Sequence, residues 1–399
     1  MTSTGYLSKG FMRIAPFCLA ISFADASWSA TIPIFPGYAE SLGASLITIG
    51  FLGSVMSIST LLTSIPLGSI SDRTGRKSIM LVGMACFIVT PLLYTLSSSP
   101  VHLLLARVLL GVAVGSTFSI GFVYITELAG SNVKSLAQGL YMTSMGIGFT
   151  VGPLLGGLVA KIWGYTISFY LSSLLGASAT LLTVLSPKTD VGSEKSIQVM
   201  KKEGVIDSFK KVTTNPRILA AGLANFFNSM LFNAIITFFP LYCSLIGFDE
   251  SQVGTSLAVR GLSSTASRFP AGTSSSRFGA FRLVLFGLVV SAIILVALPL
   301  FSDYLIIVIL MGIQGLAYGI YLTSGNVYII MEAPIHQRGT AIGVYMTFSN
   351  VSGIVSPILL GALAEAWGFS CAFQVSGILA LMGTVLTILT ARSKKMSYY

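Results

Sequence analysis

The sequence has few charged residues and almost no histidine. Asp, Glu, Lys and Arg together make up only 9% of its 399 residues, and its two histidines, His102 and His336, stand far apart. Neither the HExxH pattern of zinc hydrolases nor the GxSxG pattern of serine hydrolases occurs. Because the parts of a metal-dependent or serine-dependent hydrolase are missing, we expect no enzyme, no metal site and no bound cofactor.

Cysteine is also scarce, and its spacing carries no pattern. The four cysteines, Cys18, Cys86, Cys243 and Cys371, are scattered along the chain and match no metal-binding motif. We expect free thiols, because a thiol in an apolar segment behaves as a small hydrophobic group. A disulfide between Cys243 and Cys371 is the alternative, since both could lie near the outer face.

Apolar residues dominate what is present. They make up 54% of the chain, and the mean hydropathy of +0.86 lies far outside the range of soluble domains. The first apolar stretch is too long for a signal-peptide core and carries Asp25, so we expect a permanent helix there. The prediction is an all-α polytopic membrane protein with twelve transmembrane helices. The expected spans are residues 13–36, 46–70, 78–97, 101–126, 136–160, 165–186, 217–241, 251–272, 283–301, 304–331, 340–363 and 369–391.

One long polar interval interrupts this pattern. Residues 187–216 are rich in Lys, Ser and Glu. They predict a cytoplasmic linker between two six-helix bundles, residues 1–186 and 217–399.

The charges follow a topological order. The net charge is +10. If the N-terminus is cytoplasmic, nearly all Lys and Arg residues fall on one side, with only Lys161 clearly opposite. The positive-inside rule then predicts two cytoplasmic termini and a plasma-membrane protein. Nucleic-acid binding is the alternative explanation of the basic charge, and the loop-bound, ordered charges speak against it.

The two halves repeat each other at a constant offset of 204 residues. Between residues 120–165 and 324–369, 17 of 46 positions are identical, where composition alone gives about four. Six spans per half is an even number, so both halves enter the membrane in the same sense. This parallel repeat is typical of alternating-access transporters, whose substrate site lies between the halves near the membrane midplane.

A charged loop stands between the second and third spans. Gly68 to Lys77 has the sequence GSISDRTGRK, which resembles the GxxxDRxGRK loop motif of the major facilitator superfamily at every position. The resemblance covers essentially the whole chain and implies a transporter that is not an enzyme. A Walker phosphate loop is excluded, because six residues separate Gly68 from Gly75 and Arg76 precedes Lys77.

In that family the loop and the end of helix four form a cytoplasmic charge network. Here Glu127 is the expected partner of Arg73 or Arg76, and such pairs would bias the conformation of the transporter. The alternative is that these charges only set topology. The second half has Ser276 in place of the acid, so the gate is asymmetric. The residues expected at this gate are Gly68, Asp72, Arg73, Gly75, Arg76, Lys77, Glu127 and Lys134.

The fifth span contains GFTVGPLLGG, which is similar to the GxxxGPxxGG signature of proton-coupled drug antiporters in the superfamily. Glycines four residues apart permit close helix approach, and a proline favours a bend. Ordinary helix packing is the alternative explanation. The motif residues are Gly148, Gly152, Pro153, Gly156 and Gly157.

Three ionisable residues lie inside predicted spans: Asp25, Arg107 and Arg260. Each costs at least about 2.5 to 3.5 kcal/mol at a helix centre, so each needs a partner or a wet cavity. We expect Asp25 to bind a proton or a cationic group, and a permanent pair with Arg107 is the alternative. Further polar and aromatic residues are expected to line the cavity. These are Asn225, Asn228, Asn233, Tyr141, Gln314, Asn326 and Tyr345.

The sequence thus predicts secondary active transport, with proton-coupled efflux of small amphipathic compounds as the first hypothesis. A symporter or facilitator for sugars or other metabolites is the alternative. The expected energy source is the proton gradient, and the expected partners are a small-molecule substrate and the lipid bilayer. We expect a monomer that binds no nucleic acid.

Overall fold

The computed structural model describes residues 3–129, 134–187, 214–334 and 337–393, and within these ranges the chain is helical and forms no strand. Most of the predicted linker, residues 188–213, lies outside the described ranges. The described ranges contain long apolar helices and no strand, which confirms the all-α polytopic fold class. All four cysteines are free thiols, as the sequence predicts.

The chain forms two compact units. Unit 1 consists of Met1–Ser193 together with Pro240–Gly261, and unit 2 consists of Glu194–Phe239 together with Leu262–Tyr399. The boundaries near residues 240 and 261 fall inside two long helices, so each unit contains a part of both helices. The predicted division into residues 1–186, 187–216 and 217–399 stays a prediction.

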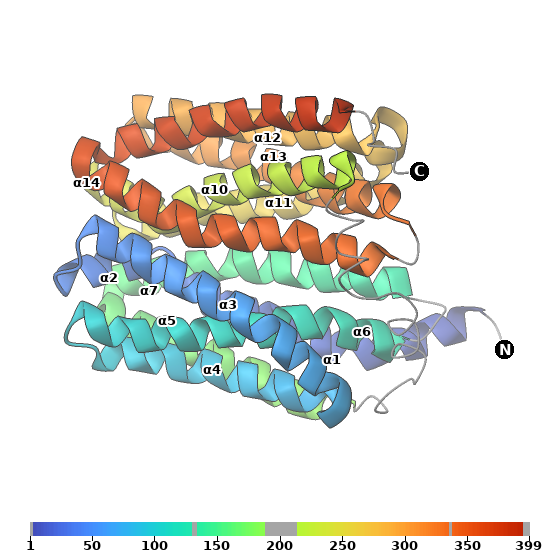
Figure 1. Ribbon diagram of the computed structural model, residues 1–399. Coiled ribbons are helices and arrows are strands. Elements are labelled where there is room, and N and C mark those ends of the chain that lie inside the picture. Colours follow the sequence, from blue (N-terminus) through green and yellow to red (C-terminus); the bar gives the residue numbers. More distant parts are fainter. Residues whose placement is uncertain (1–2, 130–133, 188–213, 335–336, 394–399) are drawn as a thin grey trace. The chain divides into compact units, whose positions relative to one another are not determined.

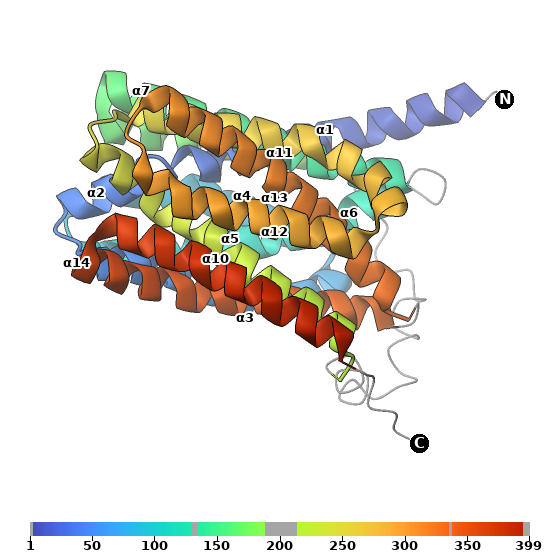
Figure 2. The same cartoon turned by 90° about the horizontal axis from the view of Figure 1, so that it is seen from above.

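Unit 1 begins with a long helix that projects past the ends of its neighbours (Figure 2). Its helices run side by side over most of their length (Figure 1). They are α1 (Ser3–Ala30), α2 (Phe35–Ser41), α3 (Leu46–Thr74), α4 (Arg76–Leu96), α5 (Pro100–Val114), the π-helical turn η1 (Gly115–Ser119), α6 (Ile120–Ala129) and α7 (Lys134–Leu185).

The remaining helices complete the chain (Figure 1). They are α10 (Pro216–Leu245), α11 (Glu250–Phe278), α12 (Ala280–Ala297), the 3₁₀ turn η2 (Leu298–Leu300), α13 (Tyr304–Glu332) and α14 (Arg338–Arg392).

The long helices account for the predicted spans. Within the described ranges, nine helical segments are long and apolar enough to cross a membrane. Two of these contain a break, at Gly164 in α7 and at Gly368 in α14, which adds two segments. The remaining span corresponds to α11, which is less apolar because it carries Arg260 and Arg268. Nine, two and one give the twelve predicted spans.

The repeat is visible in the backbone. Among the residues that the structure describes, six have positive φ, all of them glycine, and they form three pairs 204 residues apart. The pairs are Gly43 (φ 88°) with Gly247 (φ 90°), Gly75 (φ 93°) with Gly279 (φ 87°), and Gly164 (φ 81°) with Gly368 (φ 84°). The chain therefore turns in the same way at equivalent places of both halves.

Helix packing repeats at the same offset. A Cβ built on Gly115 would lie 2.9 Å from Thr63 Oγ1 and 3.2 Å from the carbonyl oxygen of Thr60. A Cβ built on Gly319 would lie 2.1 Å from Ser267 Oγ, close to Ser264 as well. The helix containing the glycine thus packs against the same turn of its neighbour in both halves.

The first span is interrupted. The helix α1 ends at Ala30, and turns cover Thr31–Ile34 before α2 begins. Pro33 and Pro36 lack the N–H group that a continuous helix would need, which accounts for the break. The expected span 13–36 is therefore one long helix followed by a short one, and α2 places Phe35 in the buried interior at 2% exposure.

Candidate functional site

The loop cluster comprises the charged residues around the turn between α3 and α4, together with Glu127 on α6. Gly75 ends α3 and begins α4 with φ 93° and ψ 134°, a conformation open to glycine and costly for other residues. This turn brings Arg76 back alongside the last turn of α3.

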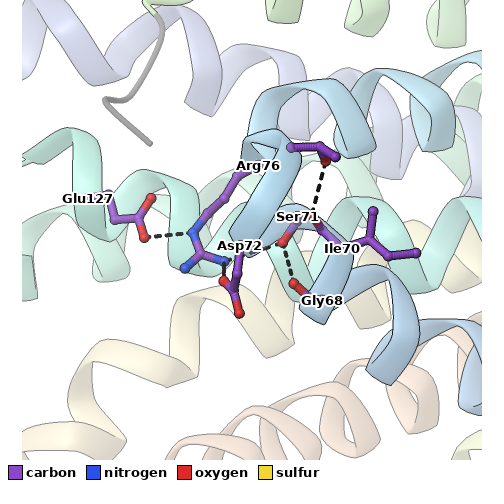
Figure 3. A network of polar contacts seen from close by, with 7 residues as sticks. Gly68, Ile70, Ser71, Asp72, Arg76 and Glu127 are labelled. Carbon is purple, nitrogen blue, oxygen red and sulfur yellow. Dashed lines mark hydrogen bonds and ion pairs between the residues drawn. The ribbon is translucent and has the colours of Figure 1, made fainter. Parts of the chain in front are cut away.

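Arg76 is the centre of the loop cluster (Figure 3). Its Nε lies 2.6 Å from Oε1 of Glu127, and its Nη1 lies 3.0 Å from Oδ1 of Asp72. The same Nη1 donates to Ser71 Oγ at 3.4 Å. One guanidinium therefore joins α3, α4 and α6. Arg73 is exposed, so of the two arginines that the sequence offered to Glu127, the structure pairs Arg76.

Two further residues of this region hold the end of α7. Lys77 Nζ donates to the carbonyl oxygens of Val184 at 2.8 Å and Ser186 at 2.5 Å. The Tyr124 hydroxyl donates to the carbonyl oxygen of Pro187. An ammonium group at the C-terminal end of a helix satisfies carbonyls that have no helical partner. Lys134, the last predicted gate residue, begins α7.

Asp25 lies deep in unit 1, on α1, with 2% exposure. Among the described residues it is the one buried Asp or Glu side chain. A Cβ built on Gly148 of α7 would lie 2.7 Å from the Asp25 Cβ. Ser29 donates to the carbonyl oxygens of Asp25 at 2.6 Å and Gly148 at 3.1 Å. The close approach of α7 thus fixes the part of α1 that carries this acid.

The predicted glycine motif packs against two different helices. Cβ atoms on Gly152 and Gly156 would lie 2.6 and 2.0 Å from the carbonyl oxygens of Ala26 and Ala30 on α1. A Cβ on Gly157 would instead lie 2.2 Å from the carbonyl oxygen of Glu250. Facing it, a Cβ on Gly254 of α11 would lie 2.3 Å from the carbonyl oxygen of Pro153. This motif therefore joins α1, α7 and the first turns of α11 within unit 1.

A second polar contact lies beyond the glycine motif, which we call the distal contact (Lys161, Tyr165, Asp249 and Glu250). Lys161 Nζ lies 2.9 Å from Asp249 Oδ2, and the Tyr165 hydroxyl donates to Glu250 Oε1 at 3.0 Å. Lys161 follows Lys134 by 27 residues on α7, about 40 Å of helix. The distal contact therefore lies at the opposite end of the first segment of α7, residues 134–163, from the loop cluster.

The electrostatics of Asp249 follow from its surroundings. Partial burial tends to raise the pKa of this carboxyl, but the ammonium group of Lys161 and the backbone N–H groups of Gln252 and Ser251 outweigh it. The pKa of Asp249 is therefore below its usual value, and the ion pair is formed at neutral pH.

Sequence reasoning missed the distal contact. Its signal was present: Lys161 and Tyr165 are four residues apart around a Trp-Gly pair, and Asp249 and Glu250 directly precede an apolar helix.

The arginines predicted to meet Asp25 have other surroundings. The Arg107 guanidinium lies over the ring of Phe35, with 3.4 Å between Cζ and the ring centroid. Its Nη1 is 3.8 Å from Met56 Sδ, and Asp25 is not among its contacts in the part of the chain that the structure describes. Arg260 is buried on α11, with 1% exposure.

Tyr141, another predicted cavity residue, belongs to an aromatic cluster of unit 1. Its hydroxyl donates to the carbonyl oxygen of Phe118 at 2.8 Å, and its ring packs near Phe17 and Phe122. Asp25 lies within electrostatic range of this hydroxyl. The structure therefore brings Asp25 and Tyr141 into one region.

The polar residues of α10 face α14 in unit 2. Asn225 Nδ2 donates to the carbonyl oxygen of Tyr345 at 2.9 Å, and the hydroxyls of Ser229 and Ser349 are 2.5 Å apart. Ser229 stands at the position equivalent to Asp25. Asn233 donates within its own helix, to the carbonyl oxygen of Ser229 at 2.8 Å.

Other predicted residues of unit 2 lie on or near α13. Gln314 is buried at 1% exposure and Asn326 is half-buried. The Asn228 side-chain oxygen is buried and has no hydrogen-bond partner. Sequence reasoning overlooked Tyr321, whose buried hydroxyl lies within electrostatic range of the Tyr345 hydroxyl. No group of three metal-ligating side chains occurs in the described ranges.

Comparison with known proteins places this geometry in a family. The family model described as Major Facilitator Superfamily matches residues 17–249 and again residues 221–397. Multidrug resistance protein 2 of Bacillus subtilis (strain 168) is 23% identical over 368 residues, which are 91% of this chain and 91% of that protein. Multidrug resistance protein MdtG of Klebsiella pneumoniae (strain 342) is 22% identical over 386 residues, 94% and 92% of the two chains.

Solved structures agree on the fold. A bacterial homolog of the human lysosomal transporter Spinster, in an inward-facing and unoccupied conformation, matches with a TM-score of 0.80 at 16% identity over 98% of both chains. The nucleoside transporter NupG matches with a TM-score of 0.76 at 17% identity over 96% of this chain and 99% of that one. At these identities the likeness concerns the fold alone.

Proposed function

Since the chain belongs to the Major Facilitator Superfamily, we propose that it exports small amphipathic compounds in exchange for protons. Membership makes it an integral membrane transporter of a small molecule and not an enzyme. Proton coupling, the direction of transport and the kind of cargo form the proposal.

The buried acid of α1 carries this proposal. Asp25 is only 2% exposed, and burial of an ionisable side chain in a membrane protein costs free energy. Such a side chain is usually functional, and a carboxyl group can hold or release one proton. Asp25 lies against Gly148 of the glycine motif. A proton exchanged at Asp25 can therefore alter the packing between α1 and α7, and that packing is a way to couple protonation to conformation.

Alternating access is the mechanism we propose. The first segment of α7, before the break at Gly164, has a polar cluster near each of its ends: Arg76 with Glu127 near one end, and Lys161 with Asp249 near the other. Pairs of this kind contribute little to folding but bias a two-state equilibrium. We propose that each cluster stabilises closure at its own end.

The relatives support the kind of cargo. Two of them are named multidrug resistance proteins, and the region around Asp25 combines an acid with aromatic rings such as Trp28, 6.0 Å from Phe149 between ring centroids. Aromatic surfaces suit amphipathic compounds. Transport of a polar metabolite is the alternative, favoured by Asn225 and Asn228 in unit 2.

The cellular setting is also proposed. The order of basic residues along the loops supports a plasma-membrane protein with both termini in the cytoplasm. We propose that it works as a monomer driven by the proton gradient, without a cofactor and without nucleic acid.

The test is the Asp25→Asn variant in inverted membrane vesicles with a pH-sensitive dye. Addition of a transported amphipathic compound should release protons from vesicles with the parent protein and fail to do so with Asp25→Asn. Ser144→Ala, which alters a neighbouring hydroxyl but no charge, serves as the control and should keep proton release. Undiminished proton release in a folded Asp25→Asn protein would exclude the proton-carrying role. Uptake of a sugar or nucleoside, unaffected by Asp25→Asn, would favour the alternative.

A further inference from the structure

Arg107 has an unusual environment for a charged residue. Its guanidinium carbon lies 3.4 Å from the ring centroid of Phe35 and 5.9 Å from that of Tyr94. Both rings are buried, at 2% and 0% exposure. Nη1 faces the Met56 sulfur at 3.8 Å, and Nε is buried without a hydrogen-bond partner. The positive charge thus rests on two π faces and a thioether, none of which is an anion.

The described acids of unit 1 have other surroundings. Asp72 and Glu127 pair with Arg76, and Asp249 pairs with Lys161. Glu250 accepts from Tyr165, and Glu40 is exposed. Asp25 packs against Gly148 of α7, and the contacts of Arg107 among the described residues do not include it. An arginine stays protonated in proteins, so an anion would stabilise this buried charge further. The cation–π contact stabilises it only in part.

Packing does not require a charge at this position. With the offset of 204, the counterpart of Arg107 is Met311, and the counterpart of Met56 is Arg260. The same two positions therefore carry Arg and Met in opposite order in the two halves. Met311 is fully buried at 0% exposure, so a methionine fills the equivalent place. The charge of Arg107 serves something other than the helix contact.

We propose that Arg107 binds the acidic group of the cargo, and that the cargo is therefore an amphipathic organic acid. This inference rests on the proposed transport function. A guanidinium presents a planar set of N–H donors that matches a carboxylate, and its Nε is still without a partner. Phe35 and Tyr94 flank the charge and fix the position of the guanidinium.

The test compares two probes that differ by one charge: dansylglycine and its methyl ester. The purified full-length protein in dodecyl maltoside is titrated with each, and binding is followed by dansyl fluorescence. Dansylglycine should bind at least about tenfold more tightly than the ester, the usual scale of one charge-assisted contact. Arg107→Met, which copies the residue of the second half, should reduce the affinity for the acid to that for the ester and leave the ester unchanged.

Arg282→Met is the matched control. It removes an arginine of the same kind from an exposed site on α12, and it should keep the preference for the acid. Equal binding of acid and ester by the parent protein would overturn the proposal, and so would an undiminished preference in Arg107→Met. If Arg107→Met does not fold, the ratio of the two affinities in the parent protein still decides.

An anionic lipid headgroup offers similar chemistry, so the titration is repeated with added phosphatidylglycerol. Displacement of dansylglycine by this lipid at comparable concentration would assign the site to lipid and overturn the cargo assignment. All measurements are at equilibrium and without a proton gradient. A failure of proton-coupled export would therefore leave this result intact.

Discussion

Lys161 and Asp249 form an ion pair of 2.9 Å between the middle of α7 and the residue that precedes α11. Lys161 stands three residues before the break at Gly164, and Tyr165, just after the break, reaches the neighbouring Glu250. Residues on both sides of the break at Gly164 therefore contact the start of α11.

The first prediction concerns pH. The pKa of Asp249 is lowered in the folded state, so its pair with Lys161 contributes stability above the unfolded-state pKa near 3.9 and loses it as the pH falls through the lower folded-state pKa. Because the side chains are 34% and 51% exposed, the contribution is about 0.2–1 kcal/mol. Thermal unfolding between pH 3 and 7 should show Asp249→Asn less stable than the parent at pH 7, with a difference that shrinks as the pH falls below the unfolded-state pKa.

A double-mutant cycle with Lys161→Met provides the control for this prediction. The two changes together should cost no more than either alone, because they remove one pair. Full additivity would contradict the pairing.

The second prediction concerns the loop cluster. Glu127→Gln should leave global stability within about 1 kcal/mol, because Glu127 is 39% exposed, but should open this end more often. A cysteine placed at Gly68, where a Cβ would meet no atom within 4 Å, reports the opening by its maleimide labelling rate. In a background without other cysteines the rate should rise up to about fivefold. Arg73→Gln, at an exposed neighbour, should not change it, and equal rates in all three proteins would count against the gate.

The third prediction separates close packing from helix propensity. Gly156→Ala should cost about 1–3 kcal/mol, because its Cβ would lie 2.0 Å from the Ala30 carbonyl oxygen and would push α1 from α7. Gly139→Ala, on the same helix and with open space around the Cβ, should be neutral or slightly stabilising. Unfolding by denaturant in detergent measures both. Similar effects of the two variants would show that the glycine face is not a packing surface.

The fourth prediction concerns the end of α7. Lys77→Met should remove the charge that holds the carbonyl groups of Val184 and Ser186, at a cost of about 0.3–1 kcal/mol. Hydrogen exchange should become faster in the last turn of α7 and stay unchanged around Lys161. Arg73→Met removes a nearby exposed charge and should leave this exchange as it is. Unchanged exchange in Lys77→Met would contradict the capping role.

Much of the fold could be predicted because hydropathy and the offset of 204 act over long stretches. The spans 13–36 and 101–126 were placed correctly along the chain, yet the break at Thr31–Ile34 and the π turn Gly115–Ser119 were not foreseen. Both depend on local backbone hydrogen bonding, which a hydropathy average over twenty residues does not detect. A proline pair such as Pro33 and Pro36 marked the first of them.

The contacts of the site were harder to predict than its residues. The sequence offered Glu127 two arginines, and only the tight turn at Gly75 decides that Arg76 reaches it. Arg107 was expected near Asp25 on grounds of depth, but depth does not fix the direction of a side chain around its helix. Its position over Phe35 follows from the broken first span, which the pattern of apolar residues did not reveal.

The three pairs of turn glycines have a consequence for handedness. At five of these positions, Gly43, Gly164, Gly247, Gly279 and Gly368, a Cβ would meet no atom within 4 Å, so neither crowding nor contact calls for glycine there. The requirement comes from the sign of φ, which favours the mirror image of the usual amino acid. The φ values at Gly164 and Gly368 suit a D-alanine, whereas at Gly156 the restriction is the carbonyl oxygen of Ala30, 2.0 Å from an added Cβ. At these turns the protein needs a residue of opposite chirality, and glycine is the encoded residue that can serve as one.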